Sequence, residues 1–244
     1  MVPSISVVVP ARNEEQAIGP CLESILASEV KPLEIIVIDN GSTDRTAEIA
    51  QSYEGVKVIF ESRPGLHIAR QTGLENALGD VVAATDSDCL VSKQWIGEIA
   101  KAFELPSTVE TYGPLEFFDG PWLDKSLSKY IYPVFLFIQD RLGQPNTAGG
   151  NHAVRRTTAL EVGGYDRPFG EDLALMMKLK ERGNIVYIPK GLVLTSARRL
   201  KKGRWKMYGL HIINSFKRVL GKETNYGQDY YSEREQNSEE KSVK

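Results

Sequence analysis

The sequence has little cysteine and no long hydrophobic run. Its two cysteines, Cys21 and Cys89, give neither a disulfide framework nor a metal-binding spacing, which is typical of a reducing compartment. The first residues lack the basic n-region of a secretory signal. No apolar run approaches the ~18 residues that a transmembrane helix needs. We therefore expect a cytoplasmic protein.

An excess of positive charge is also missing. The chain has 30 Lys and Arg residues against 32 Asp and Glu residues, a formal net charge of −2. General affinity for nucleic acid needs a basic field, so we expect no nucleic-acid partner. With 41% hydrophobic and 25% charged residues, the 244-residue chain has the composition of one large domain, or of a domain with a subdomain.

Two common nucleotide-binding motifs are absent. A dinucleotide site would show Gly-x-Gly-x-x-Gly after the first strand, but the turn there, residues 10–14, contains no glycine. There is no P-loop either. NAD is therefore not expected as a cofactor.

Apolar runs and helical patterns alternate in the first 105 residues. Strands buried on both faces are expected at 5–10, 33–39, 56–60 and 81–85, with helices at 18–26, 44–53 and 68–77. This alternation predicts an α/β fold with a mainly parallel sheet. After Pro106 the pattern changes, and we expect a strand at 111–118, partly helical structure at 123–141 and a helix at 171–182.

Two aspartates, Asp86 and Asp88, follow the apolar run 81–85 directly. Ligands bind at the carboxyl ends of strands in such sheets. Two carboxylates this close repel each other unless a cation or hydrogen bonds offset their charge, and Mg²⁺ or Mn²⁺ takes carboxylates together with substrate phosphates. The spacing alone leaves open a solvated acidic turn. A phosphatase of the haloacid-dehalogenase type also has such a pair, but on its first strand, whereas this pair follows the fourth.

The motifs resemble those of family 2 glycosyltransferases over about residues 4–200. The matching segments are Val7-Val8-Val9-Pro10 with Asn13-Glu14, Ile36–Ser42 with Thr43-Asp44, Arg63-Pro64-Gly65, Ala69-Arg70 with Gly73, Asp86-Ser87-Asp88, Gly149-Gly150-Asn151, and Glu171-Asp172. Each motif alone is weak, but their common order is specific. The resemblance implies a GT-A type fold with a Rossmann-like, mainly parallel central sheet flanked by helices and a C-terminal acceptor-side region. It also implies a UDP- or GDP-sugar donor and a divalent metal, Mg²⁺ or Mn²⁺.

The resemblance also implies roles for individual residues. Asp39 would accept a hydrogen bond from the donor's base, and Asp88 would bind the metal with Asp86 beside it or beside the ribose. Asp172 would be the general base for the acceptor hydroxyl. The other residues assigned to substrate binding are Pro10, Asn13, Glu14, Gly65, Arg70, Gly149, Gly150, Asn151, Glu171, Arg198 and Arg199. His152 is expected to be a packing residue rather than a metal ligand.

The chain after Arg198 is strongly basic before it becomes polar. Residues 198–222 contain nine Lys or Arg and no acidic residue, with apolar side chains at helical spacing. We expect a basic amphipathic helix at 201–222 and a disordered tail at 223–244. The helix could make a peripheral contact with the inner face of the membrane, or it could pack on the core. The preceding parts would be a nucleotide-sugar-binding half, 1–105, and an acceptor-binding half, 106–200.

The leading hypothesis is an inverting, metal-dependent glycosyltransferase that moves a sugar from a nucleoside-diphosphate donor to a hydroxyl acceptor. In one displacement, the acceptor oxygen attacks the anomeric carbon while Asp172 takes its proton. The alternative from another class is a non-catalytic nucleotide-sugar-binding scaffold.

Overall fold

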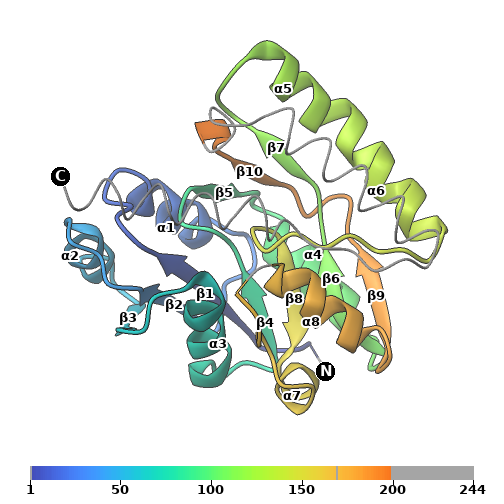
Figure 1. Ribbon diagram of the computed structural model, residues 1–244, viewed down its shortest axis with the longest axis horizontal. Coiled ribbons are helices and arrows are strands. Elements are labelled where there is room, and N and C mark those ends of the chain that lie inside the picture. Colours follow the sequence, from blue (N-terminus) through green and yellow to red (C-terminus); the bar gives the residue numbers. More distant parts are fainter. Residues whose placement is uncertain (1, 169, 199–244) are drawn as a thin grey trace. The chain divides into compact units, whose positions relative to one another are not determined.

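A computed structural model describes residues 2–168 and 170–198 of the chain (Figure 1). The strands are β1 (Ile5–Ala11), β2 (Glu34–Asp39), β3 (Val56–Phe60), β4 (Val81–Ala84), β5 (Cys89–Val91), β6 (Thr108–Tyr112), β7 (Leu115–Phe117), β8 (His152–Arg155), β9 (Asn184–Tyr187) and β10 (Val193–Thr195). The helices are α1 (Ile18–Leu26), α2 (Thr46–Gln51), α3 (Leu66–Asn76), α4 (Trp95–Phe103), α5 (Trp122–Ser126), the π-helical turn η1 (Leu127–Ile131), α6 (Tyr132–Arg141), α7 (Arg156–Glu161) and α8 (Glu171–Leu179).

The central sheet confirms the α/β prediction. Its seven strands have the order β3-β2-β1-β4-β8-β6-β9. β3, β2, β1 and β4 pair in parallel, as do β6 and β9, while β8 runs antiparallel to both of its neighbours. Parallel strands end at the same edge of a sheet, so the loops that follow β1, β2 and β4 meet there.

Helices cover both faces of this sheet, which explains why the strands are apolar throughout. Every residue of β1 is buried, with Val7 and Val9 in the core on one face and Val8 in the core on the other. α1, α2 and α4 pack on the first face, whereas α3, α7 and α8 pack on the second. The residues that they contribute include Ile18, Leu22, Ala50, Trp95 and Ile99 on the first face and Leu74, Ala159, Leu175 and Leu179 on the second.

α3 lies very close to β1, because it carries a glycine at the contact. A Cβ added at Gly73 would lie 2.3 Å from Cγ1 of Val8. Any side chain at position 73 would therefore push the helix away from the strand. This close packing fixes the helix that also carries Arg70.

The strand predicted at 111–118 is wrong as a single element. The chain turns at Gly113 and Pro114, so that β6 stays in the central sheet while β7 joins a second sheet with the order β5-β10-β7. β8 was not predicted at all. Its four residues are too few to show a periodicity, and its antiparallel insertion between β4 and β6 comes from tertiary pairing.

α5, η1 and α6 follow one another directly and form what we call the arm, residues 122–141 (Figure 1). The prediction of helical structure at 123–141 is confirmed. Pro133 lies at the start of α6, and a proline ring within a helix clashes with the carbonyl four residues earlier. That carbonyl belongs to Lys129 in η1, and the wider π-helical turn accommodates the proline.

The basic segment 201–222 and the tail 223–244 lie outside the described residues, as does Arg199. The division into halves at residue 105 stays a prediction. In the part of the chain that the structure covers, every helix is too short or too polar to span a bilayer.

Candidate functional site

Six carboxylates define what we call the acidic edge, at the carboxyl ends of the parallel strands. They belong to Glu14, Asp39, Asp86, Asp88, Glu171 and Asp172. Glu14 follows β1, Asp39 ends β2, and the Asp86–Asp88 pair follows β4. The remaining two lie in the first turn of α8. The sequence-based prediction had assigned all six to the site.

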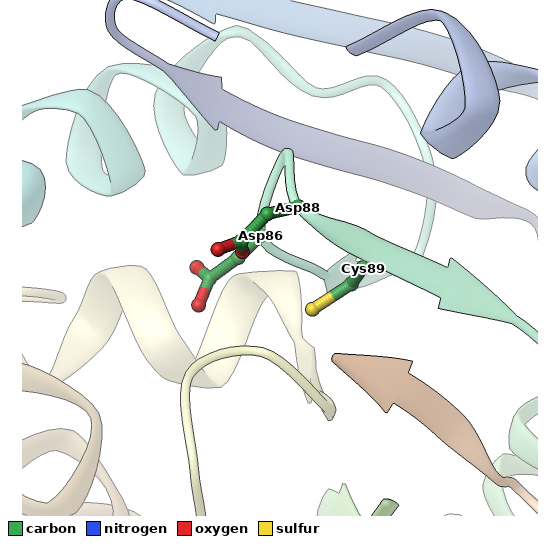
Figure 2. Close-up of side chains that lie close together, drawn as sticks. All are labelled: Asp86, Asp88 and Cys89. Atoms are coloured by element: carbon green, nitrogen blue, oxygen red, sulfur yellow. The ribbon is translucent and has the colours of Figure 1, made fainter. Parts of the chain in front are cut away.

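Asp86 and Asp88 extend from the turn between β4 and β5, with Cys89 at the start of β5 (Figure 2). One potential ligand atom from each of the three residues lies within 4.8 Å of the others. Burial and the charge of Asp86 raise the pKa of the Cys89 thiol to about 12, so it stays protonated at neutral pH. The carboxylate oxygens of Asp86 and Asp88 are therefore the ligands that a hard cation would use.

Arg70 of α3 links the acidic pair to α8. Its guanidinium is buried, and it donates from Nη2 to Asp86 Oδ1 at 2.8 Å and from Nη1 to Glu171 Oε1. Burial alone would lower the pKa of Arg70, but the charges of Glu171 and Asp86 raise it above its ordinary value. Arg70 therefore holds the strand end and the helix start together as a fixed cation.

Glu171 itself has an unusual titration. Burial raises the pKa of its carboxyl group to about 7; the nearby Arg70 lowers it in part, and the charge of Asp172 raises it. Raised carboxyl pKa values of this kind cluster at functional sites, and structural ion pairs also produce them.

Asp172 is positioned by the glycine loop that precedes β8. Its Oδ2 accepts a hydrogen bond from the backbone N–H of Gly149 at 2.6 Å, and its Oδ1 accepts one from Leu173 N at 2.8 Å. The side chain stays partly exposed. Position 149 requires glycine because a Cβ there would lie 2.1 Å from Nη1 of Arg70. The contact at Gly150 is less tight, since a Cβ there would lie 3.3 Å from Asp86 Oδ2.

Arg198 closes the other side of the acidic edge. Its Nε and Nη2 lie 3.1 and 3.0 Å from Asp88 Oδ2, and Nη2 also donates to Glu14 Oε1. Burial would lower the pKa of Arg198, whereas its hydrogen bond to Glu14 and the charge of Asp88 raise it. The contact brings a residue at the end of the described chain to the exit of β1, 184 positions away.

The charged side chains of the acidic edge fit a divalent cation by their net charge. Two guanidiniums, from Arg70 and Arg198, stand against the carboxylates of Glu14, Asp86, Asp88 and Glu171 that they contact. Asp172 adds a further negative charge beside Gly149. The excess of oxygen ligands and negative charge suits Mg²⁺ or Mn²⁺, which would bring the site nearer to neutrality.

Asp39 and Glu14 each keep one buried carboxylate oxygen without a hydrogen-bond partner in the described part of the chain. The Asp39 residue is 3% exposed, and its Oδ1 has no hydrogen-bond partner within the described chain. A buried unpaired acceptor is costly unless a ligand satisfies it. Asp39 Oδ1 is therefore available to accept an N–H group from a bound molecule.

Asn13 and Asn40 build the loops around Asp39. Asn13 has a positive φ of 55° and joins two loops, since its N–H donates to Ser42 Oγ at 3.0 Å and its Oδ1 accepts from Thr43 N at 2.8 Å. Asn40, which the sequence had indicated only as a turn residue, accepts from Gly65 N at 2.9 Å. Pro10 lies in β1, in register with Ile38 of β2.

Asn151 and His152 are occupied by contacts within the protein. Asn151 Oδ1 accepts from Trp95 Nε1 at 2.8 Å, and its Nδ2 donates to the carbonyls of Pro114 and Gly191, each at 2.8 Å. These bonds favour a positioning role for Asn151, and its assignment to the substrate stays a prediction. His152 is buried in hydrogen-bond contact with Glu110 and Tyr165, as expected for a packing residue.

The mainly parallel sheet, the Asp86–Asp88 pair after β4 and Glu171-Asp172 at the start of α8 are features for which the sequence resembles family 2 glycosyltransferases of GT-A fold. The chain belongs to the glycosyl transferase family 2, whose family model matches residues 6–162. The family and the GT-A fold expected from the motifs are thereby confirmed.

Individual relatives agree with this assignment. Glycosyltransferase AglE of Haloferax volcanii is 36% identical over 103 residues, which cover 39% of this chain and 34% of that protein. An undecaprenyl-phosphate 4-deoxy-4-formamido-L-arabinose transferase of Pectobacterium carotovorum is 35% identical over 96 residues, 36% of this chain and 29% of that protein. In both cases the match spans about a third of the relative's length.

Among solved structures, the mannosyltransferase PcManGT of Pyrobaculum calidifontis, in complex with GDP-Man and Mn²⁺, superposes with a TM-score of 0.69. The likeness covers 92% of this chain and 66% of that one at 22% sequence identity. At this identity it establishes the fold.

Proposed function

We propose that this protein is an inverting glycosyltransferase that uses a nucleoside-diphosphate sugar and a divalent metal. The observation that carries the proposal is the chain of contacts around Arg70. This one buried guanidinium bridges Asp86, at the expected metal site, and Glu171, which is adjacent to Asp172, the expected base. The residues expected to hold the metal and the residue expected to act as the base therefore lie close together, which supports the proposal.

The donor's parts find matching groups along the acidic edge. Asp39 Oδ1 is the buried acceptor for an N–H group of uracil or guanine. Asp86 and Asp88 would hold Mg²⁺ or Mn²⁺, which when bound would neutralise the diphosphate as it leaves. Arg198 lies beside Asp88 and can offer its guanidinium to a phosphate oxygen. The structure of PcManGT contains GDP-Man and Mn²⁺, which supports this class of donor and metal.

Asp172 is the proposed general base. Its carboxylate is held by Gly149 and Leu173 yet remains partly exposed, so an acceptor hydroxyl could approach it. As the acceptor oxygen bonds to the anomeric carbon, Asp172 takes its proton and the bond from that carbon to the diphosphate breaks. One displacement inverts the anomeric configuration. The name of the Pectobacterium relative, an undecaprenyl-phosphate sugar transferase, supports a lipid-linked acceptor.

Replacing Asp172 by Asn tests the proposal. Asparagine keeps the acceptor oxygen for Gly149 N–H but cannot take a proton, so turnover should fall about 10²- to 10⁴-fold. Binding of the donor, measured as thermal stabilisation by UDP- or GDP-sugars with Mn²⁺, should persist. Asp166→Asn is the matched control, since Asp166 forms a partly exposed ion pair with Lys178. Full turnover by Asp172→Asn would exclude Asp172 as the base, and absence of stabilisation by either donor class would contradict the donor assignment.

A further inference from the structure

The arm carries an unusual amount of exposed apolar surface. Eight of the 17 large hydrophobic residues that are exposed in the described chain fall within positions 118–142. They are Phe118, Trp122, Tyr130, Ile131, Val134, Phe137, Ile138 and Leu142, with exposures from 45% to 75%. Single exposed apolar residues are ordinary on protein surfaces, but a contiguous group of this kind marks an interaction site.

The exposed side chains form one stripe along the helix. Tyr130 and Ile131, Val134, Phe137 and Ile138, and Leu142 recur every three to four residues, which places them on a common face about 18 Å long. The opposite side of the arm is attached to the domain, because η1 contacts β7 and α6 contacts β9. Leu136 and Gln139 are buried there. The stripe therefore points away from the core that holds the arm.

The exposed charges along the stripe have a single sign. Between residues 118 and 142 the exposed ionic side chains are those of Lys125, Lys129 and Arg141. The carboxylates of this stretch are buried or hydrogen-bonded to the protein. Asp124 is buried. Asp140 accepts a hydrogen bond from Tyr112 Oη at 3.0 Å, and Asp119 accepts one from Ser196 Oγ at 2.7 Å. This local positive charge contrasts with the net charge of −2 for the whole chain.

Two of the cations lie over aromatic rings at the stripe itself. Lys129 Nζ is 5.6 Å from the centre of the Tyr130 ring, and Arg141 Cζ is 5.1 Å from the centre of the Phe137 ring. Long basic side chains that run along apolar groups and present their charge at the border are typical of helices at a lipid–water interface.

We propose that the arm docks on an anionic lipid bilayer, with the stripe among the acyl chains and Lys125, Lys129 and Arg141 at the head groups. Charge selects this occupant over a second copy of the chain, because a two-fold contact between two arms would bring like cations together. The arm leads through residues 143–148 to Gly149, so docking would hold the acidic edge near the membrane surface. That last consequence rests on the proposed function, whereas docking itself does not.

Flotation of the full-length protein with vesicles tests the docking. Binding should require phosphatidylglycerol in a phosphatidylcholine background and weaken with salt. A variant with Ile131→Ser, Val134→Ser and Phe137→Ser should lose binding by at least tenfold. A second, with Lys125→Gln, Lys129→Gln and Arg141→Gln, should lose roughly fivefold per cation. The matched control, Phe60→Ser with Leu78→Ser and Leu105→Ser, removes equally exposed apolar residues elsewhere and should bind like the parent.

A fluorescent label separates docking by the arm from docking by another segment. Val134→Cys provides a surface thiol for an environment-sensitive dye, since Cys21 and Cys89 are both buried. The dye emission should shift to the blue on anionic vesicles. Unchanged flotation of both arm variants, or no spectral shift at position 134, would overturn the proposal. Conversion of an oligomer to monomers by the serine variant, without effect on flotation, would instead assign the stripe to contact between copies. Neither readout involves sugar transfer, so failure here leaves the proposed activity untouched.

Discussion

The acidic edge buries charged side chains, whereas the arm exposes apolar side chains. At the edge, nearly every charged group has a partner of the opposite sign or a backbone donor, and the groups are mostly buried. Along the arm, by contrast, large apolar side chains are exposed. In each region, a group without a partner in the described part of the chain carries our proposal for what binds there. Asp39 Oδ1 is the proposed acceptor for a base N–H group, and the stripe is the proposed contact with lipid.

The largest expected effect comes from adding a methyl group at Gly149 in the acidic edge. Gly149→Ala should reduce turnover at least 100-fold, because a Cβ 2.1 Å from Arg70 Nη1 must displace the guanidinium or the loop that holds Asp172. Unfolding in urea should also show a loss of about 1–3 kcal/mol. The matched control is Gly97→Ala in α4, where the new methyl group meets Val30 at an ordinary 3.4 Å. Equal activity of the two variants would contradict the tight arrangement described for Arg70.

A second test uses the unpaired acceptor at Asp39. Asp39→Asn should weaken donor binding roughly 10- to 100-fold, since the carboxylate is replaced by a group that offers a weaker acceptor or a competing donor. The free energy of unfolding should not fall, because the substitution removes a buried charge whose Oδ1 has no partner in the covered part of the chain. Isothermal titration with UDP- and GDP-sugars measures the first quantity, and urea unfolding measures the second.

Asp80→Asn is the control for Asp39→Asn, because we expect it to lower stability and to leave donor affinity unchanged. Asp80 Oδ2 accepts from Ser4 N at 2.9 Å and from Ser4 Oγ at 2.7 Å, away from the acidic edge. Its loss should cost up to about 1 kcal/mol of stability and leave donor affinity intact. If Asp39→Asn destabilised the fold as Asp80→Asn does and still bound donor, Asp39 would be structural.

The sequence predicted where Asp39, Asp86 and Asp88 lie because these residues end or follow buried strands. The apolar runs before Asp39 and Asp86 fix where those strands end, and parallel pairing then brings the ends together. The sequence could not predict contacts between segments that are far apart along the chain. Nothing local in the sequence pairs Glu14 with Arg198, or directs Asn151 to Trp95, because both contacts depend on how the completed sheets pack. For the arm, the sequence gives apolar residues, but only the fold shows which of them stay exposed.

A third test concerns the pH dependence that burial gives to Glu171. Its pKa is raised from 4.5 to about 7 in the folded protein, so the native state holds a proton that the unfolded chain releases. Stability from this group is complete below about pH 4.5 and is lost as the pH rises through about 7. Glu171→Gln should therefore flatten the decline of the unfolding free energy across this interval, by on the order of 3 kcal/mol, since one pKa unit corresponds to about 1.4 kcal/mol. An unchanged slope in urea titrations would show that Arg70 keeps Glu171 ionised.

The smallest expected effect belongs to the arm and sharpens the contrast with the edge. Val134→Ser with Phe137→Ser should change the unfolding free energy by less than about 0.5 kcal/mol in the absence of lipid, because both side chains are already about half exposed. Leu136→Ala, one position away on the buried side of the same helix, should cost about 2–5 kcal/mol. A large loss from the exposed pair would mean that protein covers the stripe in solution. The pair of measurements thus separates a face that waits for a partner from a face that holds the arm to the domain.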